Sequence, residues 1–290
     1  MGAVEDKMIS VIMSCHNSNQ VYLKESIESI LNQTYEDFEL LVADNEVQFD
    51  LKKFLNRFND SRIKYIDNGG NIGPTASYDK LACMAKGKYV AIQDHDDISK
   101  PRRLELEAMV LDAMPEIQSV SCGIHIFGCK KERNECEIMN SEQVKQELIF
   151  WQPIKQPTWM KRKEFCNKYR YGDRFMIYDF EFWSRTRKVP HYILGSVLLD
   201  YRRSYLNSSE QRTQQIRSEH ATIVRRNLHE IGIDASLELC QGLDPYNHAG
   251  VKSQTVDEFV SYKDKLLKEI SEPLYQRKLL ELLKKGAIYE

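Results

Sequence analysis

The first 115 residues repeat an order in which a short apolar run precedes a longer amphipathic segment. Runs such as "SVIMSC" and "FELLVAD" are almost continuously apolar, which is typical of strands buried on both faces of a parallel sheet. Leu23, Ile27 and Ile30 recur at helical spacing and form one apolar face. Because strand and helix alternate, we predict a doubly wound, mostly parallel α/β sheet. The predicted strands are residues 8–15, 38–44, 62–68 and 87–93, and the predicted helices are residues 19–33, 75–85 and 101–114.

The pattern becomes less regular after residue 115. We predict strands at residues 119–128 and 191–202 and a helix at residues 176–186, and the chain reads as helical from about Asn207 onward. No internal repeat or low-complexity linker separates these parts. We therefore expect an α/β domain over residues 1–206 and a C-terminal helical extension over residues 207–290 that packs on it.

Charge and composition narrow the class of protein. With 290 residues and 42% hydrophobic residues, the chain can bury a substantial core. Its 41 basic and 43 acidic residues give a net charge of -2, which offers no electrostatic case for nucleic-acid binding. Two runs are locally basic, residues 161–170 and 202–226. Each is either a solvated helix face or a surface that meets an anionic acceptor, a phospholipid head group or a sugar diphosphate.

Cysteine usage and hydropathy indicate a protein of a reducing compartment. The seven cysteines form no C-x-x-C pair, so neither a disulfide framework nor a structural zinc site is indicated. No apolar stretch approaches the length of about 20 residues that spans a bilayer. We expect a cytoplasmic protein without a transmembrane segment, and peripheral membrane contact stays open.

Three carboxylates follow the fourth predicted strand within "AIQDHDDISKP", residues 91–101. One interpretation is a solvated turn whose acidic residues favour the start of the next helix. The other is a site for Mg²⁺ or Mn²⁺, which prefer carboxylate oxygens. Open parallel sheets bind ligands at the carboxyl ends of their strands, where residues 14–17, Asp44 and residues 94–97 all fall. Their convergence at one sheet edge favours the cation site.

The same residues carry a family resemblance. "ISVIMSCHN", "YLKESIESILNQTYEDFELLVADN", "RIKYIDNGGNIGP" and "AKGKYVAIQDHDDISKPRRLE" resemble the N-terminal half of family 2 glycosyltransferases of the GT-A fold. The resemblance is close over residues 8–110 and traceable to about residue 233. It implies a Rossmann-like, mostly parallel sheet flanked by helices. It also implies inverting transfer of a sugar from a nucleotide diphosphate sugar, with UDP the expected nucleotide, to a hydroxyl of a glycan, lipid-linked or protein acceptor.

The resemblance also assigns roles to residues. Ser14 and Asp44 match positions that contact the nucleotide base and ribose, and Asp94 and Asp96 match a D-x-D pair that binds Mn²⁺ or Mg²⁺. Asp179 in "IYDFEFWSR" falls on the position of the catalytic base, with Glu181 as a second acid. On the residues alone, the pattern favours an ordinary carboxylate at a helix N-terminus for Asp179, and only the family resemblance reverses this interpretation. The expected donor contacts are Ser14, Asn17, Asp44, Asn71, Gly73, Asp94 and Arg202, the expected metal ligands are Asp94 and Asp96, and the expected base is Asp179.

The chain departs from the family pattern at several positions. Family members commonly have an aromatic residue in place of His16, an Arg-Asn pair in place of Tyr78 and Asp79, and a histidine in place of Ser204. A catalytically degenerate nucleotide-sugar-binding protein is therefore a second hypothesis. A third is a nucleotidyltransferase, but "SCHNSNQ" lacks the glycine-rich, basic loop that would hold a triphosphate.

Overall fold

The computed structural model describes residues 8–129, 131–203, 213–245 and 250–286, which form two compact units. The predicted boundary between residues 206 and 207 lies outside the described residues. The second unit also takes in two earlier segments, one on each side of residues 154–173. The first unit comprises Met1–Ser141, Ile154–Asp173 and Val189–Tyr205, and the second comprises Glu142–Pro153, Arg174–Lys188 and Leu206–Glu290.

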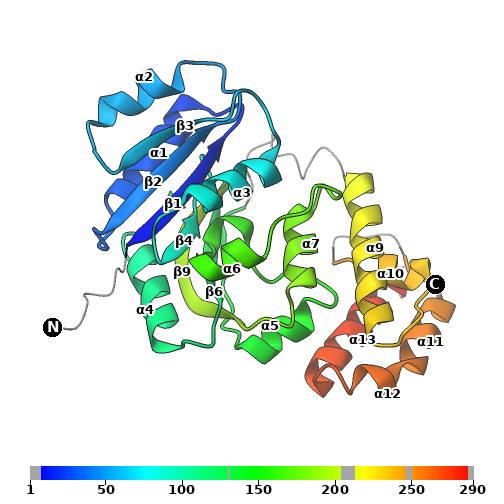
Figure 1. Ribbon diagram of the computed structural model, residues 1–290. Coiled ribbons are helices and arrows are strands. Elements are labelled where there is room, and N and C mark those ends of the chain that lie inside the picture. The colour runs from blue at the N-terminus through cyan, green and yellow to red at the C-terminus, as the bar shows by residue number, and fades with distance from the viewer. Residues whose placement is uncertain (1–7, 130, 204–212, 246–249, 287–290) are drawn as a thin grey trace. The chain divides into compact units, whose positions relative to one another are not determined.

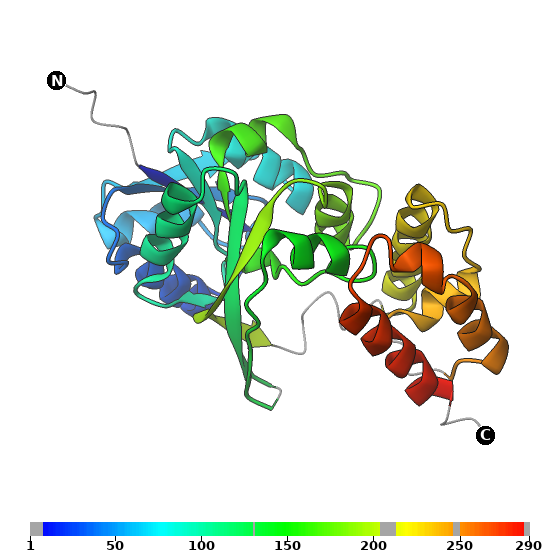
Figure 2. The ribbon, with the colours of Figure 1, turned by 90° about the horizontal axis from the view of Figure 1, so that it is seen from below.

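One sheet forms the centre of the first unit (Figure 1). Its described strands follow the order β3-β2-β1-β4-β8-β6-β9-β5, with β7 paired to β6. Strands β1 to β4 are mutually parallel, as predicted. β8 joins β4 and β6 in antiparallel pairs, and the long strands β6 and β9 run parallel, side by side in Figure 2. The strands are β1 (Ile9–Cys15), β2 (Phe38–Asp44), β3 (Ile63–Asp67), β4 (Tyr89–Ile92), β5 (Ile98–Ser99), β6 (Ser119–Gly128), β7 (Arg133–Glu135), β8 (Met160–Arg162) and β9 (His191–Arg203).

Helices cover both faces of this sheet, which explains the continuous apolar character of β1. Val11 and Met13 join one apolar core with the buried faces of α1, α2 and α4. Ser14 points to the opposite face, where its hydroxyl lies 2.7 Å from that of Ser77 in α3. The predicted doubly wound arrangement is thus confirmed. The helices of this unit are α1 (Gln20–Leu31), α2 (Leu51–Leu55), α3 (Pro74–Met84), α4 (Arg103–Ala113) and α6 (Lys163–Lys168), with 3-10 turns η1 (Asn56–Phe58) and η2 (Gln156–Thr158).

Local sequence signals fix the helix starts. Asn19 caps α1 by accepting from the backbone N–H groups of Val21 and Tyr22. Asp50 caps α2 in the same way, and Pro74 occupies the first position of α3, where its missing N–H costs no hydrogen bond. These caps set where each helix leaves the sheet edge.

The basic run at residues 161–170 serves helix ends of the first unit. The Arg162 guanidinium donates to the carbonyls of Leu111 and Met114 at the end of α4. The Lys163 ammonium donates to the carbonyls of Ala82 and Cys83 at the end of α3. A helix C-terminus presents unpaired carbonyls and a partial negative charge, so both cations are used structurally. For these two residues, the interpretation as a surface for anionic acceptors is wrong.

The second unit is helical and has its own apolar core. Phe259, Leu266 and Ile270 are buried in this core and Tyr262 packs against it. Helices α9 to α13 gather around it (Figure 2). Within the described residues, no helix is both long and apolar enough to cross a membrane. The helices are α5 (Ser141–Glu147), α7 (Tyr178–Arg185), α9 (Thr213–Glu230), α10 (Leu237–Gly242), α11 (Ser253–Ser261), α12 (Lys263–Leu266) and α13 (Glu272–Gly286).

Candidate functional site

Strand register brings the predicted polar residues of the first unit to one edge of the sheet. Cys15 pairs with Asp44, Asp44 pairs with Asp67, and Ile12 pairs with Ile92 in successive parallel strands. The segments that follow β1, β2, β3 and β4 therefore leave the sheet at the same side. The predicted convergence is confirmed for this unit.

A network of small polar side chains joins these strand ends. The hydroxyl of Ser77 contacts Ser14 and accepts from the Asn68 amide at 2.9 Å. Asn45 is 2% exposed, and its amide donates to Asn71 at 3.2 Å. Its carbonyl oxygen accepts from the Asn68 amide at 3.2 Å. Asn45 thus ties the end of β2 to the glycine-rich loop after β3, a role that sequence reasoning missed.

His16 and Asn17 continue this network from the end of β1. His16 Nδ1 lies 2.9 Å from the backbone carbonyl of Asn45, which only accepts, so Nδ1 is the donor. His16 Nε2 then accepts from the Asn17 amide at 3.0 Å in the neutral imidazole. Asn17 is exposed and has φ 47°, a left-handed conformation that asparagine tolerates well. The imidazole therefore holds the exposed Asn17 side chain beside the end of β1.

Asp44 and Gly73 border the same edge. Asp44 is partly exposed, and its carboxylate accepts from the N–H of Val47 at 3.1 Å and from the hydroxyl of Tyr65 at 3.4 Å. Gly73 has φ 81°, and its N–H donates to the Asn71 side chain at 2.9 Å. A Cβ at residue 73 would meet no atom within 4 Å, so the backbone conformation, not space, requires glycine here.

The acidic turn after β4 has three carboxylates in different surroundings. Asp94 and Asp96 are partly exposed, and Asp94 accepts from the Tyr78 hydroxyl at 2.7 Å. Desolvation and the Asp96 charge raise the pKa of Asp94 to about 6, although the Tyr78 hydrogen bond opposes this. Asp97 is 1% exposed, and burial followed by the charges of Asp96 and Asp94 raises its pKa well above the ordinary value. Asp97 accepts from the Arg202 N–H at 2.8 Å and faces the protein interior.

Buried polar groups support this turn from beneath. The Gln93 amide donates to the carbonyls of Asp94 and Asp97, at 3.1 and 2.8 Å. Its oxygen accepts from Arg103, a guanidinium with no exposed surface that also donates to the Ile92 carbonyl at 2.7 Å. A buried cation beside three clustered carboxylates offsets part of their mutual repulsion. The sequence did not indicate this role of Arg103 as a buried cation, because in the sequence it looks like any other charged residue of an amphipathic helix.

Arg202 reaches the acidic turn from β9. Its guanidinium donates to the Asp96 carbonyl at 2.8 Å and to the Glu25 carboxylate at 2.5 Å. The rings of Tyr22 and Phe127 lie 4.1 and 4.6 Å from it. Arg202 is therefore held against the turn. Ser204, at the position where a metal-binding histidine is common, lies outside the described residues.

The acidic turn offers the partly exposed carboxylates of Asp94 and Asp96 to a cation. Among the described residues, no three His, Cys, Asp or Glu side chains are arranged to hold a metal ion. Mg²⁺-type sites, however, commonly use one or two carboxylates and complete their coordination with substrate phosphates. The charge of Asp96 disfavours ionisation of Asp94, and a divalent cation beside both would relieve this repulsion. The residues fit a cation shared with a diphosphate, not a cage made by the protein alone.

Asp179 belongs to the second unit, near the start of α7. Its carboxylate accepts from the Gln152 amide at 3.0 Å and from the Phe180 N–H at 2.8 Å. Phe180 and Trp183 of the same helix are buried. Glu181 is 8% exposed and pairs with Arg185 and Arg226 in the same unit, so it is held as a structural carboxylate.

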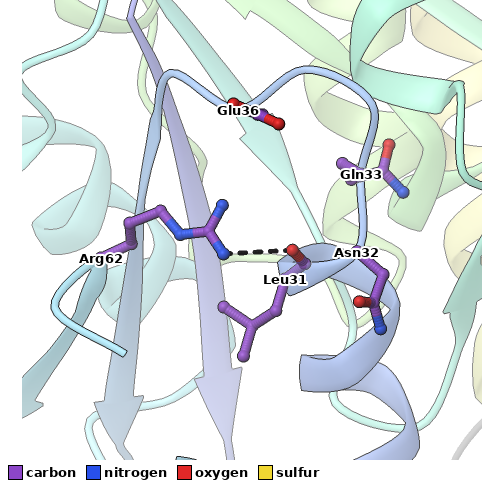
Figure 3. A pocket seen from close by; sticks show the side chains of 5 residues that line it. All are labelled: Leu31, Asn32, Gln33, Glu36 and Arg62. Carbon is purple, nitrogen blue, oxygen red and sulfur yellow. Dashed lines mark hydrogen bonds between the residues drawn. The ribbon is translucent and has the colours of Figure 1, made fainter. Parts of the chain in front are cut away.

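A surface hollow of about 570 Å³ lies at the other end of the sheet (Figure 3). Arg62 donates across it to the Leu31 carbonyl at 3.1 Å. Its lining residues lie at the end of α1, in the segment after it or just before β3, so they lie near the amino ends of the strands. The hollow is distinct from the predicted donor edge. It is lined by Leu31, Asn32, Gln33, Glu36 and Arg62.

Comparison with known proteins gives the family. The model of "Glycosyl transferase family 2" matches residues 10–231. The chain belongs to this family. An uncharacterized glycosyltransferase of Methanocaldococcus jannaschii is 30% identical over 211 residues, covering 70% of this chain and 73% of that protein. The O-antigen biosynthesis glycosyltransferase WbnJ of Escherichia coli is 33% identical over 205 residues, covering 67% and 79%.

Solved structures give the fold. The S. aureus protein TarS, residues 1–349, in complex with UDP-GlcNAc matches with a TM-score of 0.64 over 96% of this chain and 89% of that chain. At 13% sequence identity this likeness concerns the fold alone. The glycosyltransferase described here thus has the GT-A fold with C-terminal helices, as its sequence predicted.

Proposed function

We propose that this family 2 glycosyltransferase transfers a sugar from a nucleotide diphosphate sugar, with UDP the expected nucleotide, to an acceptor hydroxyl with inversion at the anomeric carbon. The observation that carries the proposal is the convergence of four strand ends on one polar edge beside the Asp94–Asp96 pair. Ligands of open α/β sheets bind at such an edge. Ser14, Asn17 and Asp44 would bind the nucleoside, and Asn71 and Gly73 would allow its close approach.

Names of similar proteins support the donor and acceptor classes. One structural neighbour was solved with UDP-GlcNAc. The Escherichia coli enzyme WfgD, 32% identical over 108 residues that cover 37% of this chain and 42% of that protein, is named a UDP-Glc:alpha-D-GlcNAc-diphosphoundecaprenol beta-1,3-glucosyltransferase. WbnJ is named for O-antigen biosynthesis. We infer a role in glycan biosynthesis on a glycan or lipid-linked acceptor.

Different residues of the chain would carry out the separate steps of sugar transfer. Mn²⁺ or Mg²⁺ bound by Asp94 and Asp96 would neutralise charge on the departing diphosphate. Arg202 would fix the acidic turn through its contact with the Asp96 carbonyl, and its predicted direct contact with the diphosphate stays a prediction. Asp179 would accept the proton of the acceptor hydroxyl, a contribution of roughly 10² to 10⁴ in rate. Inversion follows when this hydroxyl attacks opposite the leaving diphosphate.

The first experiment is a donor screen. Thermal unfolding would be followed with UDP-, GDP- and dTDP-sugars, each with Mn²⁺, with Mg²⁺ and with a chelator. We expect a UDP-sugar to raise the unfolding temperature in the presence of a metal, because a ligand bound to the folded state stabilises it. Product analysis of transfer with a lipid-linked glycan acceptor follows. Binding without transfer to any acceptor would favour the degenerate sugar-binding protein, and absence of nucleotide-sugar binding would refute the proposal.

A further inference from the structure

Gln152 lies where it can control the carboxylate that we assign as the base. The Gln152 side chain is 8% exposed, and its amide donates to Asp179 Oδ2 at 3.0 Å. The Phe180 N–H donates to the other oxygen, Oδ1, at 2.8 Å. With a protein donor on each oxygen, the plane of the carboxylate is fixed. Gln152 lies 27 positions before Asp179, so its effect depends on tertiary structure.

The backbone that carries Gln152 is anchored from α9. Asn227 has no exposed surface, and its amide donates to the carbonyls of Leu148 and Ile149 at 3.1 and 3.0 Å. The same side chain accepts from the Ser184 hydroxyl in α7 at 2.7 Å. One buried asparagine thus fixes both the segment before Gln152 and the helix that bears Asp179.

The backbone before Asp179 is anchored from the same helix. The Glu219 carboxylate of α9 accepts from the N–H groups of Met176 and Ile177 at 2.7 and 3.2 Å. These N–H groups precede the first turn of α7, where helix geometry offers no internal acceptor. Both partners of the Gln152–Asp179 hydrogen bond are therefore held by α9, which favours a fixed geometry over a fluctuating one.

We propose that Gln152 is the positioning residue of the Asp179 base. It orients Oδ2 by its amide hydrogen bond and favours the ionised carboxylate. This inference rests on the proposed function. A donor hydrogen bond to a carboxylate stabilises its charged form, so the base stays deprotonated and ready to accept a proton at lower pH. Correct orientation matters because small displacements of reacting groups lower the rate by large factors.

The test compares Gln152→Leu and Gln152→Glu with wild type. Single-turnover transfer is measured as a function of pH, and donor affinity is measured by calorimetry. Leucine removes the donor at similar volume, and we expect transfer to fall about 10- to 100-fold. The acidic limb of the pH profile of Gln152→Leu should move to higher pH. Glutamate places a second negative charge beside the Asp179 carboxylate, so the acidic limb of Gln152→Glu should move to still higher pH. Donor affinity should not change in either variant.

Controls separate this inference from the proposed function. Gln143→Leu replaces an exposed glutamine of α5 and should leave rate and pH profile unchanged. Asp179→Asn tests the base itself. If Asp179→Asn is inactive but the pH limb stays in place in both Gln152 variants, Gln152 is only a structural residue and the inference is wrong. If Asp179→Asn retains normal transfer, the base assignment fails and the role of Gln152 fails with it.

Discussion

The polar sheet edge of the first unit and the surroundings of Asp179 in the second unit are built by different means. At the sheet edge, the predicted site residues lie at or just after the carboxyl ends of β1 to β4, and parallel register gathers these strand ends. Around Asp179, the position of the carboxylate depends on contacts that are distant in sequence, such as Glu219 with Met176, 43 residues apart. The sheet edge is therefore a consequence of topology, whereas the base region is a consequence of helix packing.

Replacing Asp179 should have the largest effect. The amide of Asp179→Asn keeps the shape of the carboxylate but cannot accept a proton, so we expect transfer to fall by about 10² to 10⁴. Donor binding should survive, because the predicted nucleotide contacts belong to the first unit. Calorimetry and product formation measure the two effects separately. Asp257→Asn, on an exposed position of α11, is the matched control. Near-normal turnover of Asp179→Asn would remove it as the base.

Replacing Asp96 should remove metal-dependent nucleotide binding at the sheet edge of the first unit. We expect Asp96→Asn to abolish the enhancement of nucleoside diphosphate binding by Mn²⁺, a loss of about 10²-fold in affinity, or about 3 kcal/mol. Metal-free binding should change little, because the nucleoside contacts remain. Calorimetric titration with UDP, in the presence of Mn²⁺ and in the presence of a chelator, measures the metal-dependent and the metal-free affinity. If affinity and metal response stay at wild-type values, the cation is held elsewhere.

The difference between the two regions explains how far sequence reasoning reached. Ser14, Asp44 and Asp94 could be placed together because each ends a strand with a clear apolar pattern. Asn45 and Gln93 were missed because nothing local distinguishes a buried amide that links two loops from an ordinary polar residue. The long-range hydrogen bonds of these side chains are defined only once the sheet is formed.

The basic runs were ambiguous for the same physical reason. A lysine or arginine that binds an anion and one that caps a helix have the same local sequence. Arg162 and Lys163 turn out to cap the ends of helices whose carbonyls lie 48 to 81 residues earlier in the chain. Residues 204–212 of the second run lie outside the described residues. For the described part of the run at residues 202–226, contact with an anionic acceptor stays a prediction.

Glu107, the buried partner of Arg103 beneath the acidic turn, should make the free energy of unfolding depend on pH. Burial raises the pKa of Glu107 from 4.5 to about 7, although Arg103 lies 3.3 Å away and opposes the shift. The folded state then holds this proton more tightly than the unfolded state. The associated stability is complete below about pH 4.5 and is lost as the pH rises through about 7.

Glu107→Gln should remove this dependence. Between about pH 5 and pH 8, the free energy of unfolding of wild type should fall on the order of 3 kcal/mol more than that of the variant. Glu105→Gln is the matched control in the same helix, because Arg102 lowers the pKa of Glu105 to about 2, below the tested range. Denaturant unfolding at both pH values measures the difference. Equal slopes for wild type and Glu107→Gln would contradict the prediction.

The smallest effect should come from two adjacent arginines of α9 that test whether the basic run is a support. Arg226 donates to Glu181 at 3.1 Å and to the Ser184 hydroxyl at 2.8 Å, and the Glu181 side chain is only 10% exposed. Arg225 pairs at 3.7 Å with Asp234, whose side chain is 86% exposed.

We expect Arg226→Met to lower the free energy of unfolding by about 1–3 kcal/mol, because it leaves a largely buried carboxylate with fewer donors. Arg225→Met should cost less than about 1 kcal/mol, as exposed ion pairs do. Denaturant unfolding gives both values, and the salt dependence of transfer gives a second readout. If instead both variants are equally stable and Arg226→Met weakens transfer most at low salt, Arg226 acts on an anionic acceptor and not as a support of α7.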